Sequence, residues 1–507
     1  MDVFQSYTSH QCQADILDEV TKSKYKAISL KRSLSTIAGS LGATSMIQNE
    51  IFKHMDSGSF GASLPASIQR QINRNNCPPP SIQQYRDLQQ RLVDRIHGDL
   101  QKLSEDLGVP FSFPVEQPQT KKRRQQFDDI TFRHTFEVSE DFEMAFMYTP
   151  QDLLTLSLEL TSTNLAAPQG RVGAMKAMLS GDVSPQAILA AWPEIAAAEK
   201  HFGVDDAWDM GFYQETYRRG ETLIDGYTAP LLTSVRKYAK HGIPAGLRRT
   251  MWATLLGANI PRARGDFNRL RTGMRTTQLL VDAFTAPDIE LHGLDEHFFV
   301  FESEMYELFA CFIRDASVSR QAALTPPLPT GVASEAEVAV PCGVYPVAGF
   351  VRLIAPFCLL FSDQAEAYGL FRAMYCRYFC GLVTVAPGRL GLPYLLSAVE
   401  TMVHTTNPRI APHLTQLGLT VLDLVHPWLV FGFAGFLSPV EWACLWDRVL
   451  AQDSLLPLAL LAAGIIELRA DAMLTLSSAN DVRDLFSDFT AIKAIAVIQS
   501  FVNQSIH

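Results

Sequence analysis

From Ser81 to the end of the chain, apolar residues recur at intervals of three and four, and strict alternation of apolar and polar residues is almost absent. This spacing predicts helices, because residues three and four apart share one face of an α-helix. The clearest example lies within residues 81–107, whose apolar positions are Tyr85, Leu88, Leu92, Ile96, Leu100, Leu103 and Leu107. The sequence therefore predicts an all-α fold with few strands.

The opposite face of the predicted helix 81–107 is charged, so the apolar stripe must be buried against something. Two kinds of partner remain open: another helix of this chain, or a coiled-coil or scaffold partner outside it. A dense basic run follows at residues 121–124. Such a run is typical of a solvated linker, a nuclear signal or a contact with an anionic membrane.

The composition limits the functional classes. The chain has 507 residues with 47% hydrophobic and 19% charged residues, which is typical of a globular protein of two or three domains. Its net charge of -10 disfavours general nucleic-acid binding, which needs a basic surface. No P-loop, GxGxxG or HExxH pattern occurs, so we expect no cofactor and no metal site.

The most apolar run, residues 455–466, contains a proline and is shorter than the ~20 residues that a membrane span needs. We expect a buried core helix there and no transmembrane segment. The N-terminus has no apolar signal region, so we expect a cytoplasmic protein, with peripheral contact to endomembranes as an option. The eight cysteines form no CxxC pair and are predicted to be buried free thiols.

Changes in composition suggest three regions. Residues 1–130 are predicted to form an N-terminal helical or coiled region with the basic linker, and residues 131–216 a helical connecting region with a helix starting at Ser184-Pro185. Residues 217–507 are predicted to form the main helical domain. Within that domain, residues 318–341 are rich in proline and small residues and are expected to form an insert loop.

The segment HGIPAGLRRTMWATLLGA begins at His241 and predicts a new helix from about Ala245. Arg248 and Trp252 lie four residues apart on one face of this helix, so the guanidinium is positioned to stack on the indole. A packed tryptophan near a helix N-terminus is the simpler interpretation.

This segment resembles the opening of a TBC domain, the helical fold of GTPase-activating proteins for Rab GTPases. The family opens with a Gly-x-Pro-x-x-x-Arg-x-x-x-Trp pattern, and the matching residues here are Gly242, Pro244, Arg248 and Trp252. A later segment, HPWLVFGFAGFLSPVEWACLWDRVL, is similar to another family pattern through Trp428, Trp446 and Asp447. The resemblance covers about residues 217–507 and looks closest to the subfamily of TBC domain family member nineteen.

The resemblance implies a two-lobed helical domain, preceded by a separate N-terminal helical region, and a GTP-bound Rab-family GTPase as partner. Members of this family supply an arginine, in an I-x-x-D-x-x-R pattern, and a glutamine, in a Y-x-Q-G pattern. An arginine supplied in trans stabilises transition-state charge and is worth roughly 10³–10⁵ in rate, and the glutamine orients the attacking water.

Neither finger side chain is found at its expected position. With Asp288 as the aspartate of the first pattern, the arginine slot falls on Leu291; with Asp282 it falls on Thr285. We prefer Asp288 because of its distance to the segment FFVFE. No arginine or lysine occurs from Thr276 to Ile313.

The second pattern fits the segment PCGVYPVAGF. Gly349 matches its glycine, which places the glutamine slot on Ala348 and leaves Tyr345 one residue from the tyrosine slot. No glutamine, asparagine or histidine lies between Ala322 and Asp363. Methyl and isobutyl groups cannot donate hydrogen bonds to a phosphate.

Three hypotheses follow. The chain is a Rab-binding regulatory protein of membrane traffic with degenerate finger slots, a pseudo-GAP with weak or no dual-finger activity. Alternatively it is an active GTPase-activating protein that uses displaced arginines, or a helical scaffold subunit that docks through residues 81–107. The candidate displaced arginines are Arg264, Arg269, Arg271, Arg275, Arg314 and Arg352.

Overall fold

The computed structural model describes residues 80–114, 148–162, 179, 182–196, 200–206, 209–224, 231–292, 298–332 and 338–504. The chain divides into two units, Met1–Asn75 and Asn76–His507, and every element described here belongs to the second. The predicted helix 82–107 is therefore part of the main unit. The boundaries at residues 130 and 216 stay predictions, and the basic run 121–124 lies outside the described residues.

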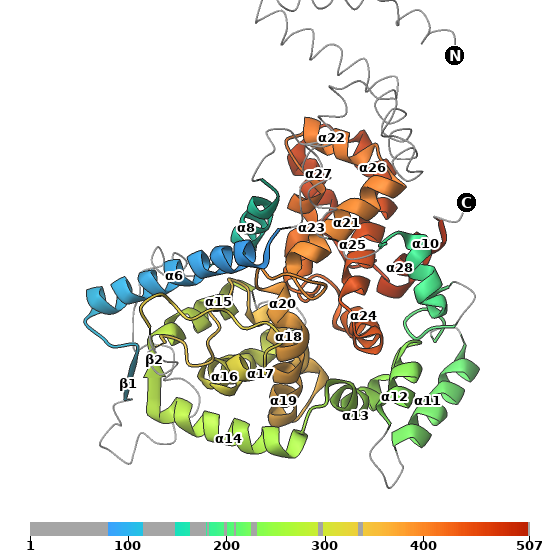
Figure 1. The fold of residues 1–507 in the computed structure, drawn as a ribbon. Coiled ribbons are helices and arrows are strands. Elements are labelled where there is room, and N and C mark those ends of the chain that lie inside the picture. The colour runs from blue at the N-terminus through green and yellow to red at the C-terminus, as the bar shows by residue number, and fades with distance from the viewer. Residues whose placement is uncertain are drawn as a thin grey trace, which may run out of the picture. The chain divides into compact units, whose positions relative to one another are not determined.

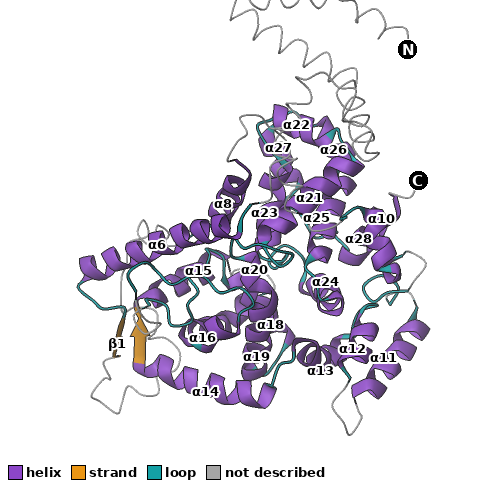
Figure 2. Ribbon diagram, viewed as in Figure 1, coloured by secondary structure: helices purple, strands orange, loops and turns teal. Residues whose placement is uncertain are grey.

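Helices dominate the described residues, as the sequence predicts (Figures 1 and 2). The two described strands, β1 (Ser112–Pro114) and β2 (Thr277–Leu279), form one short antiparallel pair in which Ser112 faces Leu279. This pair joins the segment after the first described helix to the middle of the chain. The all-α prediction is confirmed.

The first described helix, α6 (Ile82–Leu107), begins at a capping box between Ser81 and Gln84 and ends at Gly108 in the left-handed conformation. It contacts α8 (Pro150–Ser162) and the 3₁₀ helix η5 (Leu280–Phe284). Its apolar stripe is buried within this chain, through Tyr85, Leu88, Leu92, Val93, Ile96, Leu100 and Leu103.

At about 1.5–3 kcal/mol for each buried apolar side chain, the stripe of α6 contributes roughly 10 kcal/mol or more. Of the two kinds of partner that the sequence leaves open, the structure shows an internal one, and nothing in the described residues supports a coiled-coil or scaffold partner for this stripe. Its apolar face is already in the core.

The next helices form one group, drawn in green to orange-brown in Figure 1, in which α14 packs on α16 and α19, and α16 packs on α18. Stacked and edge-on aromatic rings fill the interior of this group, including Phe309, Phe312, Phe350, Phe371 and Tyr375. The bounds are α13 (Ala245–Leu256), α14 (Ile260–Thr276), α15 (Thr285–His292), η6 (Phe299–Phe301), α16 (Glu302–Arg314), α17 (Ser317–Gln321), α18 (Val351–Leu360), α19 (Gln364–Met374), the π-turn η8 (Tyr375–Phe379) and α20 (Cys380–Leu382).

The C-terminal helices form a second group around α25, which packs against α21, α23, α24 and α28. Almost all of α25 is buried, so the prediction of a core helix at 455–466 is confirmed. The bounds are α21 (Leu392–Thr406), α22 (Ile410–Gln416), α23 (Val421–Val430), α24 (Pro439–Gln452), α25 (Leu456–Leu468), α26 (Ala470–Thr475), α27 (Ala479–Leu485) and α28 (Ala494–Gln504).

Helix α13 connects the two groups, since it contacts α19 of its own group and α24 of the second group. The helices before it are α10 (Pro185–Ala191), η4 (Pro193–Ile195), α11 (Met210–Ile224) and α12 (Leu232–Ala239), and α10 begins at the predicted Ser184 cap. None of the described helices is both long and apolar enough to cross a membrane. The described cysteines are buried free thiols, as predicted.

The predicted insert 318–341 differs from expectation at its start. Residues 317–321 form the short helix α17 instead of a loop. The side chain of Val318 in this helix is fully buried in the core. Further along, the insert lies against α6: the Gln90 amide donates to the Leu328 carbonyl at 2.8 Å, and Asp94 accepts the Thr330 N–H at 2.7 Å. Residues 333–337 lie outside the described residues.

Candidate functional site

The predicted framework residues meet at one buried carboxylate. Asp447 of α24 accepts the Arg248 Nη2–H at 3.1 Å, the Trp252 Nε1–H at 2.7 Å and the Ile243 N–H at 3.0 Å. Arg248 and Trp252 thus share a face, as predicted, but both point to Asp447 and the expected stacking of one on the other is wrong. Asp447 satisfies both donors, and in this way it ties α13 to the C-terminal helix group.

Burial lowers the pKa of the Arg248 guanidinium, but the charge of Asp447, the neighbouring Cys444 and the hydrogen bonds to both side chains together raise it. The pair is almost fully buried. Removing one partner of such a pair costs about 3–5 kcal/mol, since it leaves the other charge without compensation. Asp447 and Arg248 therefore support the fold at a position where no reacting group could reach them.

Gly242, the first residue of the opening pattern, is required by its backbone. Its φ is 97°, and a Cβ there would lie 2.6 Å from Nη1 of Arg448. Arg448 in turn donates to the carbonyls of Phe202 and His241. The turn before α13 is thus held by a buried arginine that the sequence patterns do not single out.

Asp288 joins the two predicted finger segments. Its carboxylate, on α15, accepts the Gly349 N–H at 2.5 Å and the Val351 N–H at 3.0 Å. Burial raises the pKa of Asp288 to about 6, although these two backbone donors lower it. Asp282, the other candidate aspartate, instead forms a buried ion pair with Arg314. Asp288 thus connects α15 with the segment 349–351, whereas Asp282 does not.

The loop before α18 has little free space. Gly349 has a φ of 89°, and a Cβ there would lie 2.7 Å from the Phe431 ring. Arg352, one turn further on, places its guanidinium 5.4 Å from the Phe431 ring centre and 5.3 Å from that of Phe436. These contacts fix the loop against the second helix group.

The two slot residues differ in exposure. Leu291, near the end of α15, is 58% exposed, whereas Ala348 is 6% exposed. The N–H of Ala348 donates to the Tyr148 carbonyl at 2.8 Å, and Val347 pairs with Tyr148 in a parallel bridge. The Tyr345 hydroxyl lies 3.1 Å from Nδ1 of His97 on α6.

Sequence reasoning missed Tyr148 and His97. Both come from segments before the part of the chain that carries the family patterns. The helical spacing of α6 predicts which face is buried, but no signal in the sequence indicates what that face covers.

The candidate displaced arginines are distributed over several ion pairs. Arg314 donates to both oxygens of Asp282 in a buried pair. Arg269 pairs with Asp266 one turn away, Arg271 pairs with Glu307, and Arg264 pairs with Asp363. Arg275 is exposed near the end of α14. Of these, Arg264 and Arg271 also line a pocket.

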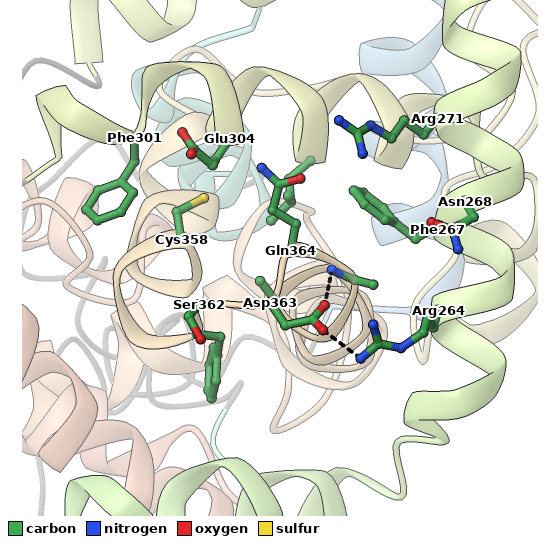
Figure 3. A pocket seen from close by; sticks show the side chains of 14 residues that line it. Arg264, Phe267, Asn268, Arg271, Phe301, Glu304, Cys358, Ser362, Asp363 and Gln364 are labelled. Carbon is green, nitrogen blue, oxygen red and sulfur yellow. Dashed lines mark hydrogen bonds and ion pairs between the residues drawn. The ribbon is translucent and has the colours of Figure 1, made fainter.

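That pocket, of about 680 Å³, lies between α14, η6, the start of α16 and the α18–α19 turn. Figure 3 shows Arg264, Asn268 and Arg271 on one side and Phe301, Glu304 and Cys358 on the other. Two basic and two acidic side chains line it, with Asp363 and Glu304 as the acids. Since the charges are balanced, the pocket has no marked preference for an anion.

The remaining candidate residues are packed in the core. Trp428 packs against Phe433, Phe486 and Phe489. Trp446 donates its Nε1–H to the Gly432 carbonyl and packs edge-on against Phe379. Both tryptophans therefore stabilise the second helix group and its junction with the first.

A family model matches part of the region that carries the predicted patterns, and the opening pattern at residues 242–252 lies outside the residues that it matches. Residues 345–474 match the family model described as the Rab-GTPase-TBC domain. The human protein TBC1 domain family member 19 is 28% identical over 376 residues, which is 70% of this chain and 70% of that protein.

Two solved structures also resemble the chain. The RabGAP TBC domain of a Chlamydomonas flagellar protein has a TM-score of 0.44 and 14% identity, over 60% of this chain and 93% of that one. The Ypt/Rab-GAP domain of Gyp1p has a TM-score of 0.44 and 12% identity, over 58% and 97% of the two chains.

Proposed function

We propose that this chain, whose residues 345–474 match the Rab-GTPase-TBC domain, binds a GTP-loaded Rab-family GTPase and regulates it without the two finger side chains. The proposal assigns the arginine slot to Leu291 and the glutamine slot to Ala348. Neither side chain can stabilise the charge that develops on the transferred phosphoryl group. The protein would then act as an effector or adaptor in membrane traffic, peripherally on cytoplasmic faces of endomembranes.

The observation that carries this proposal is the contact of Asp288 with the backbone of Gly349 and Val351. This contact links the first turn of α15 to the loop before α18. A domain with an arginine at 291 and a glutamine at 348 would present its fingers from those two elements. The contact of Asp288 with both segments supports this assignment of the slots, in which the side chains at 291 and 348 carry no reactive group.

A binding assay with a panel of Rab proteins tests the proposal. We expect at least one GTP-loaded Rab to bind more tightly than its GDP-loaded form. Leu291→Asp should weaken that binding, since it adds a charge beside the proposed interface. Val440→Asp is the matched control, because Val440 is an exposed valine on α24 with a similar exposure of 63%. Equal binding of the GTP-loaded and GDP-loaded forms of every Rab in the panel would contradict the proposal.

The second candidate function is an active GTPase-activating protein that uses displaced arginines. It is favoured by Arg264 and Arg271, which are partly exposed and line the pocket in Figure 3. Single-turnover GTP hydrolysis separates the two functions. Since an arginine finger is worth roughly 10³–10⁵ in rate, acceleration above about 10-fold by the unchanged chain would favour this second candidate.

In that case, changing the responsible arginine to alanine should abolish acceleration while binding persists. The variants to compare are Arg264→Ala, Arg269→Ala, Arg271→Ala, Arg275→Ala, Arg314→Ala and Arg352→Ala. Arg314→Ala and Arg352→Ala need a stability control, because both side chains have packing roles. If no variant changes the rate, the displaced-arginine mechanism is wrong.

The scaffold hypothesis loses its main motivation, since α6 buries its stripe inside this chain. The scaffold hypothesis predicts that no Rab binds in a nucleotide-dependent way in the assay above. No specific contact in the described residues favours it.

A further inference from the structure

We propose that α6 and Tyr148 form a fixed internal cover over residues 341–350, so that a GTPase can reach the Leu291 side of the site but not Ala348. The identity of the partner rests on the proposed function; the cover itself does not. The consequence is that position 348 lies outside the GTPase interface whatever side chain it carries.

The first part of the cover is Tyr148. Its carbonyl accepts the Ala348 N–H at 2.8 Å, and its backbone pairs with Val347. Its own side chain is 3% exposed, and its hydroxyl donates to the Val383 carbonyl at 2.9 Å. The backbone edge at the glutamine slot is thus already paired with another segment of this chain.

The second part is α6, which holds three separate loops through polar side chains. His97 lies 3.1 Å from the Tyr345 hydroxyl in the slot loop. Gln89 accepts the Val385 N–H at 3.0 Å, and Asp94 accepts both the N–H and the hydroxyl of Thr330 at 2.7 Å. One helix therefore positions the slot loop, the loop after α20 and the insert together. In Figure 1, α6 is the long blue helix beside α8.

The apolar burial of α6 decides between a removable and a fixed cover. Seven apolar side chains of α6 are in the core. Their burial is comparable in size to the whole free energy of a micromolar association. A GTPase that had to displace α6 would lose many orders of magnitude in apparent affinity. The exposed ion pairs Arg91–Glu159 and Arg95–Asp152 add little to this.

The arginine side of the site is different. Leu291 is 58% exposed on α15, and Val300 nearby in the chain is 61% exposed on η6. Exposed apolar side chains of this size suit a protein partner. The contact surface that we assign to the GTPase therefore centres on α15 and η6.

Restoring the fingers tests the cover in the full-length chain. We expect Leu291→Arg/Ala348→Gln to give the same single-turnover hydrolysis rate as Leu291→Arg alone, within about 2-fold. Val440→Arg controls for the added charge. A further acceleration of about 10-fold or more from Ala348→Gln would overturn the cover, because it would place position 348 at the attacking water.

Amide hydrogen exchange tests the cover without a measurement of GTP hydrolysis. In the free, unchanged chain we expect the Ala348 N–H to exchange at least about 100-fold more slowly than in an unstructured peptide. Addition of a GTP-loaded Rab at saturation should leave this rate unchanged. Rapid exchange in the free chain, or protection lost when the Rab binds, would overturn the proposal.

These results separate the two proposals. If no Rab binds, the proposed function fails, whereas slow exchange at Ala348 in the free chain still supports the cover. If a Rab binds and Ala348 exchanges rapidly, the cover fails while the proposed function stands.

Discussion

The two slots that would hold the fingers of a TBC domain are joined by one carboxylate but have opposite surroundings. Asp288 connects α15 to the backbone of Gly349 and Val351. Leu291 on one side is 58% exposed, and Ala348 on the other is 6% exposed. In the cover that we propose, the difference comes from α6 and Tyr148, which lie before the segments with the family patterns. A finger position can therefore lose its function in two ways: through replacement of its side chain, or through burial under another segment of the chain.

Removal of the link between the slots should have the largest effect. Asp288→Ala leaves two buried backbone N–H groups without an acceptor, which costs about 4 kcal/mol at 1–3 kcal/mol for each group. Urea unfolding at pH 7.5 measures this loss. A loss below about 1 kcal/mol for the alanine variant would show that the link is unimportant.

The pH dependence of stability should reveal the same carboxyl group. Burial raises the pKa of Asp288 from its ordinary value of 3.8 to about 6. The unfolded chain releases this proton near pH 4, and the folded chain keeps it until about pH 6. The stabilisation of the folded state by the Asp288 carboxyl group is therefore complete below pH 4 and is lost as the pH rises through 6.

This rise in pKa corresponds to about 3 kcal/mol. Relative to the unchanged chain, Asp288→Asn should gain about that much stability between pH 4 and pH 7, since the amide does not titrate. Urea unfolding of both proteins at several pH values isolates this group from the others. A constant difference in stability between the two proteins would contradict the expected titration.

The same side chain should have different costs in the two slots. Ala348→Gln forces a longer polar side chain under the cover and should destabilise the fold by about 2 kcal/mol. Leu291→Gln, on the exposed side, should change stability by less than about 0.5 kcal/mol. Thermal unfolding of the two variants compares the sites directly. Equal costs at the two positions would remove the distinction between open and covered slots.

The contact between α6 and the slot loop should have the smallest effect. The hydrogen bond between His97 and Tyr345 is expected to contribute about 1 kcal/mol. A double-mutant cycle with His97→Ala and Tyr345→Phe measures its coupling energy. The two changes should be less than additive by that amount; full additivity would mean that the two groups do not interact in solution.

Much of the fold follows from sequence patterns with a direct physical basis. The spacing of Leu88, Leu92 and Ile96 predicts both the helix α6 and its buried face, and Ser184 predicts where α10 begins. Gly242, Arg248, Trp252 and Asp447 match the family patterns, but these patterns do not indicate that Arg248 and Trp252 meet Asp447 at the junction between the helix groups. Arg248 does not stack on Trp252, because its guanidinium pairs with Asp447, a carboxylate 199 residues away along the chain.

The site is less predictable because it depends on contacts between distant segments. The family spacing of Asp288 and Gly349 indicates where the slots fall, and the Asp288 contacts agree with that alignment. No local pattern indicates that Tyr148 pairs with residue 347, since such pairing depends on backbone atoms rather than on side-chain type. Val318 shows the same limit, because a single valine in a polar segment gives no signal that it reaches the core.

Cysteine labelling at the two slots tests the difference between them most directly. Leu291→Cys and Ala348→Cys, each in the full-length chain, would be reacted with a maleimide and read by peptide mass spectrometry, which resolves the native cysteines separately. We expect Leu291→Cys to react at least about 10-fold faster than Ala348→Cys, and a GTP-loaded Rab to protect only position 291. Equal labelling of the two positions, or protection of position 348 by the Rab, would contradict a covered glutamine slot.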